Sequence, residues 1–206
     1  MKKEKINKYN KSRLVIGSLI ILIGFYLFLF DDYSEYKINK IEEQKVEKFF
    51  DEQNKEYVEE TILKEKSKKE VKKTNNDYVA IIEILTINLK KGLVSKSSDY
   101  NNVNYNIEIL NESKMPDVEN GNFILAGHSG TGRVAFFKRL HELKLGNEIY
   151  IYFKGIKYRY KVAKIYDIPK NGYALINRDK SRTTLTMITC KDNTDKQIVV
   201  ISYLID

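Results

Sequence analysis

The sequence is poor in the residues that cross-link, interrupt or specialise a chain. Among its 206 residues there are one cysteine, two prolines, two histidines and no tryptophan. A single cysteine excludes a disulfide within the chain, so Cys190 is either a reactive thiol or an inert buried one. The sequence also lacks zinc-ligand spacing, a glycine-rich phosphate loop and an aromatic–basic RNA motif. The net charge of +8 is therefore weak support for nucleic-acid binding, and no nucleic-acid partner is expected.

The N-terminal part of the sequence changes character sharply. Residues 1–13 are basic, residues 14–30 carry no charge, and two aspartates follow directly. At about 1.5 Å per residue the uncharged stretch extends for roughly 25 Å, near the lower limit for a transmembrane helix. A cleaved signal peptide is the alternative, but the small residues of a cleavage site are missing after Phe30. We predict an uncleaved anchor at 14–30 in the cell membrane, a cytoplasmic tail at 1–13 and an extracellular remainder.

Residues 31–76 form a charged segment without glycine or proline. Acids and bases alternate in it, and its sparse apolar residues recur at rough helical spacing. This pattern predicts a solvated helical stalk or linker that is too polar to build a core of its own. A coiled coil is the alternative, although no heptad pattern continues through the segment.

From residue 77 onward, short runs rich in isoleucine, valine, tyrosine and threonine alternate with turn residues such as Lys91-Gly92. This texture predicts an all-β domain at 77–206, either a barrel or a sandwich. The predicted strands lie within 78–87, 105–110, 122–128, 147–153, 156–166, 183–190 and 197–204. Residues 134–144 are the best candidate for a short helix, because their apolar side chains share one face.

Two of the strand-like runs end in residues with reactive side chains. One run ends in Cys190, and another ends in His128. A thiolate is strongly nucleophilic and histidine transfers protons near neutral pH, so the pair suits acyl transfer through a covalent intermediate. Strand alternation alone also allows a buried, unreactive Cys190 that points inward. His141 is expected to be an exposed helix residue, and it is the alternative acid/base if His128 is buried and remote.

The residues around these two positions resemble a known family. The segments Leu125-Ala126-Gly127-His128 and Thr186-Met187-Ile188-Thr189-Cys190, in this order and behind an apolar N-terminal stretch, resemble the signature motifs of sortases. Met187 stands where the family usually has leucine, a swap of similar volume. Sortases are membrane-anchored cysteine transpeptidases of Gram-positive bacteria, and the resemblance covers roughly residues 77–206.

The resemblance implies a closed eight-stranded β-barrel with one or two short helices, preceded by the transmembrane helix and the charged stalk. It implies that Cys190 is the nucleophile and His128 the acid/base, with Thr189 and Ser129 as candidates for substrate contacts. The implied substrates are surface or pilin proteins with a C-terminal sorting signal of the Leu-Pro-x-Thr-Gly type. A thioacyl intermediate would join them to an amine of a cell-wall precursor or a pilin lysine. No cofactor and no metal ion are expected.

The chain departs from the family pattern at one position. Sortases carry an arginine on the strand after the cysteine, whereas this sequence has Gln197 there, preceded by Lys196. Gln197 donates a neutral hydrogen bond, and Lys196 has the charge but belongs to the opposite strand face. The loop arginines Arg133, Arg178 and Arg182 are further candidates for the role. Because losing an oxyanion donor costs about 3–4 kcal/mol, one alternative is a weak or inactive sortase-like domain that binds peptides or scaffolds envelope assembly. A second alternative is a hydrolytic peptidase that lacks an amine partner.

Overall fold

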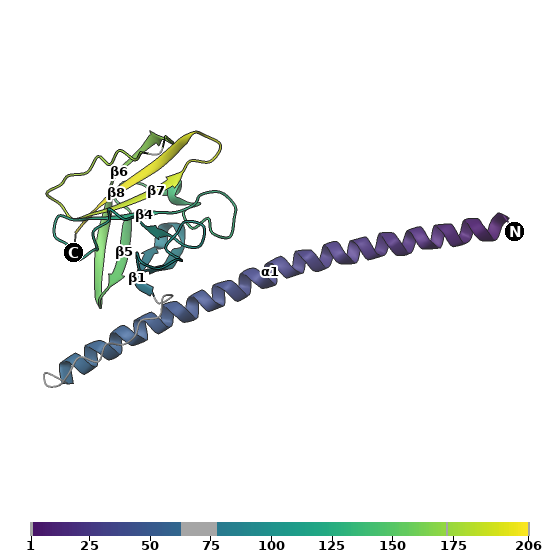
Figure 1. Ribbon diagram of the computed structural model, residues 1–206, viewed down its shortest axis with the longest axis horizontal. Helices are drawn as coiled ribbons and strands as arrows, with labels where there is room; N and C mark the ends of the chain where they lie inside the picture. Colours follow the sequence, from purple (N-terminus) through teal and green to yellow (C-terminus); the bar gives the residue numbers. More distant parts are fainter. Residues whose placement is uncertain (1, 63–77, 172, 206) are drawn as a thin grey trace. The chain divides into compact units, whose positions relative to one another are not determined.

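The computed structural model describes residues 2–62, 78–171 and 173–205, so the predicted stalk beyond residue 62 lies outside the described residues. The described elements, in chain order, are α1 (Lys2–Ile62), β1 (Tyr78–Ile84), the 3₁₀ helix η1 (Leu85–Ile87), β2 (Leu89–Val94), β3 (Glu108–Ile109), β4 (Asn122–Ala126), the 3₁₀ helix η2 (Leu140–Glu142), β5 (Glu148–Phe153), β6 (Ile156–Pro169), β7 (Thr184–Cys190) and β8 (Lys196–Leu204) (Figure 1). The chain divides into two compact units, residues 1–43 and residues 44–206.

The first unit contains the N-terminal part of α1, including the apolar stretch 14–30. Within the described residues, no helix combines the length and the apolar character needed to cross a bilayer. The transmembrane helix expected from the sequence is therefore not shown by the structure. The apolar stretch is instead an inner part of the longer helix α1, which carries charged residues on both sides of it.

The strands of the second unit form one sheet in the order β2-β1-β5-β6-β8-β7-β4-β3, which curls into a barrel (Figure 1). Neighbouring strands are antiparallel except β4 and β7, which are parallel. The barrel is nearly closed rather than closed, because β2 and β3 are the two ends of the sheet. β3 has only two residues, and both pair with β4. The amide of Asn106, just before β3, donates to the Gly92 carbonyl of β2 at 3.0 Å and bridges the gap.

Strand alternation divides the apolar side chains between the interior and the outer face of the barrel. On β7, Leu185 and Met187 are fully buried in the interior cluster. The alternate residue Ile188 belongs to a second cluster on the outer face, with Ile124, Ile168, Val199, Ile201 and Tyr203. Cys190 follows Ile188 by two residues and therefore shares the outer face. The alternative of an inward-pointing Cys190 is thus excluded.

The helix predicted at residues 134–144 is wrong. Only Leu140–Glu142 is helical, as the 3₁₀ turn η2, and most of the remaining segment forms turns. The backbone amide of Phe137 donates to the carbonyl of His128 at 3.0 Å, while that of Ala135 donates to Gly132 three residues before it. In an α-helix, the amides of Phe137 and Ala135 would instead donate to the carbonyls four residues earlier. The segment is therefore tied to the end of β4.

The turn predicted at Lys91-Gly92 is also wrong, because both residues lie within β2 and pair with β1. The chain reverses earlier, at η1, where Asn88 adopts the left-handed conformation with φ of 52°. Gly92 serves packing instead of turning, since a Cβ atom at this position would lie 2.1 Å from the ring of Tyr78. Gly92 wrongly indicated a turn, because the ring that requires its small size belongs to Tyr78, a residue distant in sequence.

The C-terminal part of α1 belongs to the same compact unit as the barrel. Its residues Val46 and Phe49 are buried against Ile81 of β1. The ring of Phe50 packs edge-on against Tyr152 of β5, with the ring centroids 5.0 Å apart. Residues 46–50 therefore cover an apolar patch on the outer face of β1 and β5.

Candidate active site

Cys190 and His128 lie at the same ends of two adjacent parallel strands. Asn122 of β4 pairs with Thr184 of β7, and this register continues to Ala126 and Ile188. The next step is held by the Gly127 amide, which donates to the Ile188 carbonyl at 3.1 Å. Continuing the register by one residue more places His128 level with Cys190. Both residues are half-buried, so they are accessible from the outer face.

Gly127 is required by a close approach of Phe137. A Cβ atom on Gly127 would lie 2.8 Å from Cδ2 and 3.0 Å from Cγ of the Phe137 ring. Phe137 is fully buried, and its backbone amide donates to the His128 carbonyl. Phe137 therefore holds the chain at two points: its ring lies against Gly127, and its backbone amide binds the carbonyl of His128. This contact explains why a glycine stands directly before His128.

Thr189 joins the two strand ends. Its side chain is buried, and its hydroxyl donates to the Gly127 carbonyl at 2.8 Å. Thr189 was predicted to contact substrate, but its hydroxyl is hydrogen-bonded within the protein and links β7 to the residue before His128. Ser129, the other predicted substrate contact, is half-buried and directly follows His128.

Gln197 is the residue directly opposite Cys190 on the antiparallel neighbour β8. The adjacent pair carries the backbone hydrogen bond, from the Lys191 amide to the Lys196 carbonyl at 2.9 Å. Cys190 and Gln197 therefore form a non-hydrogen-bonded pair, the kind whose side chains lie closest, with Cβ atoms about 4.5–5.5 Å apart. Lys196 is exposed and points to the other strand face. Of the two, Gln197 is the one placed beside the thiol.

Two of the three candidate arginines lie at the far end of β7. The guanidinium of Arg178 donates to the carbonyls of Asn120 and Arg182 at 3.2 and 3.3 Å. Arg182 itself lies over the Tyr203 ring, 4.1 Å from the centroid. Because β7 spans roughly 20 Å at about 3.3 Å per residue, neither reaches Cys190. Arg133, the third candidate, is exposed in the loop that follows His128.

Asn104 is a neighbour of His128 that the sequence did not predict. Its Oδ1 atom lies 3.4 Å from Nε2 of His128. Nε2 can donate to this oxygen when it carries a proton. No local signal marks Asn104, since it lies in a polar loop before β3. His141, the alternative acid/base, is exposed on η2.

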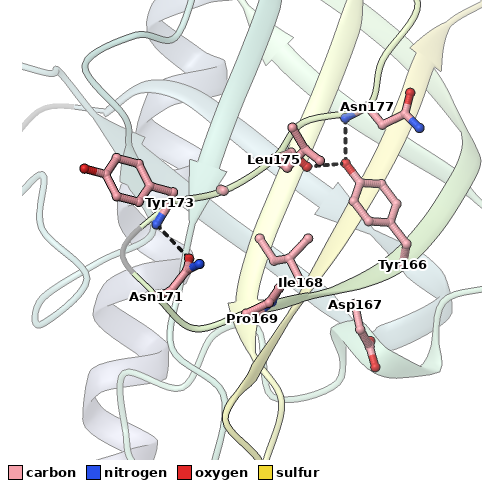
Figure 2. A pocket seen from close by; sticks show the side chains of 9 residues that line it. Tyr166, Asp167, Ile168, Pro169, Asn171, Tyr173, Leu175 and Asn177 are labelled. Carbon is pink, nitrogen blue, oxygen red and sulfur yellow. Dashed lines mark hydrogen bonds between the residues drawn. The ribbon is translucent and has the colours of Figure 1, made fainter.

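A groove of about 500 Å³ lies on the outer face over β6, two strands away from Cys190. Its floor includes Ile168 of β6, which pairs with Gln197, which in turn pairs with Cys190. The three residues therefore share one face of three adjacent strands. The rest of the lining comes from β6 and from the loop before β7, namely Tyr166, Asp167, Pro169, Asn171, Tyr173, Ala174, Leu175 and Asn177 (Figure 2). The lining is mainly apolar, which suits an extended peptide with apolar side chains.

Known proteins resemble this chain in sequence and in fold. The family model of the sortase domain matches residues 82–205. The chain is 25% identical over 202 residues to sortase A of Bacillus anthracis, covering 92% of this chain and 94% of that protein. It is 26% identical over 125 residues to sortase D of Bacillus subtilis, covering 61% and 60%. The structure of a Clostridium perfringens sortase D5 transpeptidase superposes with a TM-score of 0.61 and 26% identity, covering 81% of this chain and 99% of that one.

Proposed function

Because this chain belongs to the sortase family, we propose that it is a cysteine transpeptidase that cleaves a sorting signal of the Leu-Pro-x-Thr-Gly type. The product is joined to an amine of a cell-wall precursor or of a pilin lysine. The observation that carries this proposal is the parallel register of β4 and β7, which brings Cys190 and His128 to one end of the barrel. The apolar groove beside Gln197 provides the surface for the peptide.

The reaction has two balanced steps. Sγ of Cys190, whose proton His128 has taken, attacks the threonine carbonyl carbon; the C–S bond forms as the C–N bond to glycine breaks, and His128 gives that proton to the departing amine. The acceptor amine then attacks the thioester carbon, the C–S bond breaks, and the proton of the amine passes to His128. In both steps the side-chain amide of Gln197 donates to the oxygen that becomes negatively charged.

The test uses fluorogenic sorting-signal peptides and mass spectrometry of the protein. Cys190→Ala should abolish cleavage, and the wild-type protein should carry an acyl adduct on Cys190 when no amine is supplied. His128→Ala should lower the rate strongly, whereas His141→Ala, the matched control at an exposed histidine, should leave it unchanged. A Cys190→Ala protein that cleaves as fast as wild type would contradict the proposal.

The neutral residue Gln197 at the usual arginine position favours a second candidate function. With a weaker oxyanion donor, the domain would bind peptides or scaffold envelope assembly without turning them over. Absence of an acyl adduct across a broad peptide panel, in folded protein with a titratable thiol, would favour this binder. A hydrolytic peptidase is distinguished by adding an amine: a transpeptidase forms the amide product, and a hydrolase does not.

The proposal includes a place in the cell. The basic segment 1–13 and the uncharged segment 14–30 support an anchor in the membrane with the barrel on the extracellular side. Fractionation of cells producing the full chain, followed by protease treatment of intact cells, tests this. Barrel fragments released from intact cells support it, and protection of the barrel from protease contradicts it.

A further inference from the structure

One hydroxyl holds the loop that forms a wall of the groove. The hydroxyl of Tyr166 on β6 donates to the Leu175 carbonyl at 2.9 Å and accepts from the Asn177 amide at 2.8 Å. Figure 2 shows the Tyr166 ring extending from β6 to the chain at these two residues. Partial burial raises the pKa of Tyr166 above its ordinary value, so the hydroxyl keeps its proton at neutral pH and can donate.

The segment 173–177 depends on such tethers because much of it is not held by burial. The side chains of Tyr173 and Leu175 are 83% and 77% exposed. Ile176 packs against the outer-face cluster, and Lys164 donates to the Asn177 carbonyl at 3.1 Å. Tyr166 binds two backbone groups at once, one on each side of Ile176. Removing its hydroxyl leaves a carbonyl and an amide that must turn toward water, which moves the wall of the groove.

We propose that Tyr166 is a positioning residue that holds segment 173–177 as the wall of the groove and thereby sets the affinity for the peptide. This inference rests on the proposed function, in which the groove receives the peptide. Tyr166 does not touch the reacting atoms, so its effect is on substrate binding rather than on the chemical step. The ring of Tyr166 also packs on the outer-face cluster, and phenylalanine preserves that packing.

The test compares Tyr166→Phe with a matched control, Tyr152→Phe. Tyr152 is a half-buried tyrosine on β5 whose hydroxyl donates to Glu83 at 2.7 Å, on the face covered by α1. With a fluorogenic Leu-Pro-x-Thr-Gly peptide, Tyr166→Phe should raise KM about five- to thirtyfold, the equivalent of one to two hydrogen bonds, with kcat nearly unchanged. The control variant should leave both constants unchanged.

A second readout does not depend on activity. Limited chymotrypsin digestion of the folded protein should cut the exposed segment after Tyr173 or Leu175 faster in Tyr166→Phe than in wild type or control, with mass spectrometry locating the cut. If Tyr166→Phe does not fold, Lys164→Met removes the neighbouring tether at Asn177 and should act in the same direction. Wild-type digestion rates at this segment would overturn the inference. If no peptide is turned over by any variant, the proposed function fails while the digestion still decides the role of Tyr166.

Discussion

Replacing Gly127 by alanine should disturb both the barrel and the site through one contact. The added methyl group would lie 2.8, 3.0 and 3.3 Å from three atoms of the Phe137 ring, whereas carbon atoms prefer about 3.5–4.0 Å. Phe137 is fully buried, and because protein interiors are close-packed, its ring moves away only by displacing neighbouring side chains. Its backbone amide is bonded to the His128 carbonyl, so a displaced Phe137 pulls on the residue that we propose as acid/base.

The expected cost follows from overpacking a filled interior. Extra methyl groups in well-packed cores cost about 1–3 kcal/mol, so Gly127→Ala should lower the free energy of unfolding by that amount. Phe137→Leu removes part of the ring and should cost about 1–2 kcal/mol alone. In the double variant the two changes compensate, and the total should fall short of the sum by at least about 0.5 kcal/mol. Gly132→Ala is the control, since a Cβ atom there has no atom within 4 Å.

The measurement is a double-mutant cycle by urea unfolding, with peptide cleavage measured on the same proteins. Gly127→Ala should lose activity at urea concentrations where the protein is fully folded, and Phe137→Leu should restore part of it. Strictly additive free energies in the cycle would refute the packing argument. An unchanged cleavage rate in a destabilised Gly127→Ala protein would refute the link from Phe137 to His128.

Three further predictions follow from single contacts. Gln197→Ala should lower the cleavage rate about a hundredfold through loss of an oxyanion donor, while Lys196→Ala on the opposite face should not; equal effects would contradict the assignment. Phe49→Ala should lower the free energy of unfolding by about 3–5 kcal/mol, because its ring is buried on the barrel, and KM should stay unchanged. Arg159 and a neighbouring tyrosine lower the pKa of Glu148 to about 2. Its contribution to stability is therefore full above pH ~5 and lost as the pH falls toward ~2, so the urea midpoints of wild type and Glu148→Gln should converge across that range; a constant difference would contradict this.

Local patterns predicted most of the strands but misplaced two connections. The runs ending in Cys190 and His128 became β7 and β4, because side-chain alternation is a property of the strand itself. The helix expected at 134–144 does not form, because the apolar residues whose spacing suggested it have a different structural role. Phe137 fills the interior below Gly127 and gives its amide to His128. A partner distant in sequence took the hydrogen bond that a helix needs.

The loop before β3 contains two asparagines whose structural roles the sequence did not predict. Nothing local distinguishes Asn104 from the asparagines around it, yet folding brings it to Nε2 of His128. Asn106 in the same loop bonds Gly92 and joins the two ends of the sheet. Such roles depend on which loop crosses which strand end, and that is decided by the packing of the whole barrel.

The sequence by itself determined that Cys190 and His128 each end a strand, and its resemblance to sortases indicated Gln197 at the position of the usual arginine. It left two choices open: which face of β7 is the interior, and which candidate lies beside the thiol. Alternation gives two faces without saying which is buried, and the curvature of the sheet decided that Cys190 lies on the outer one. The register of β7 with β8 then placed Gln197 opposite Cys190 and put Arg178 and Arg182 at the far end. Both decisions come from pairing between distant segments, which a one-residue shift would reverse.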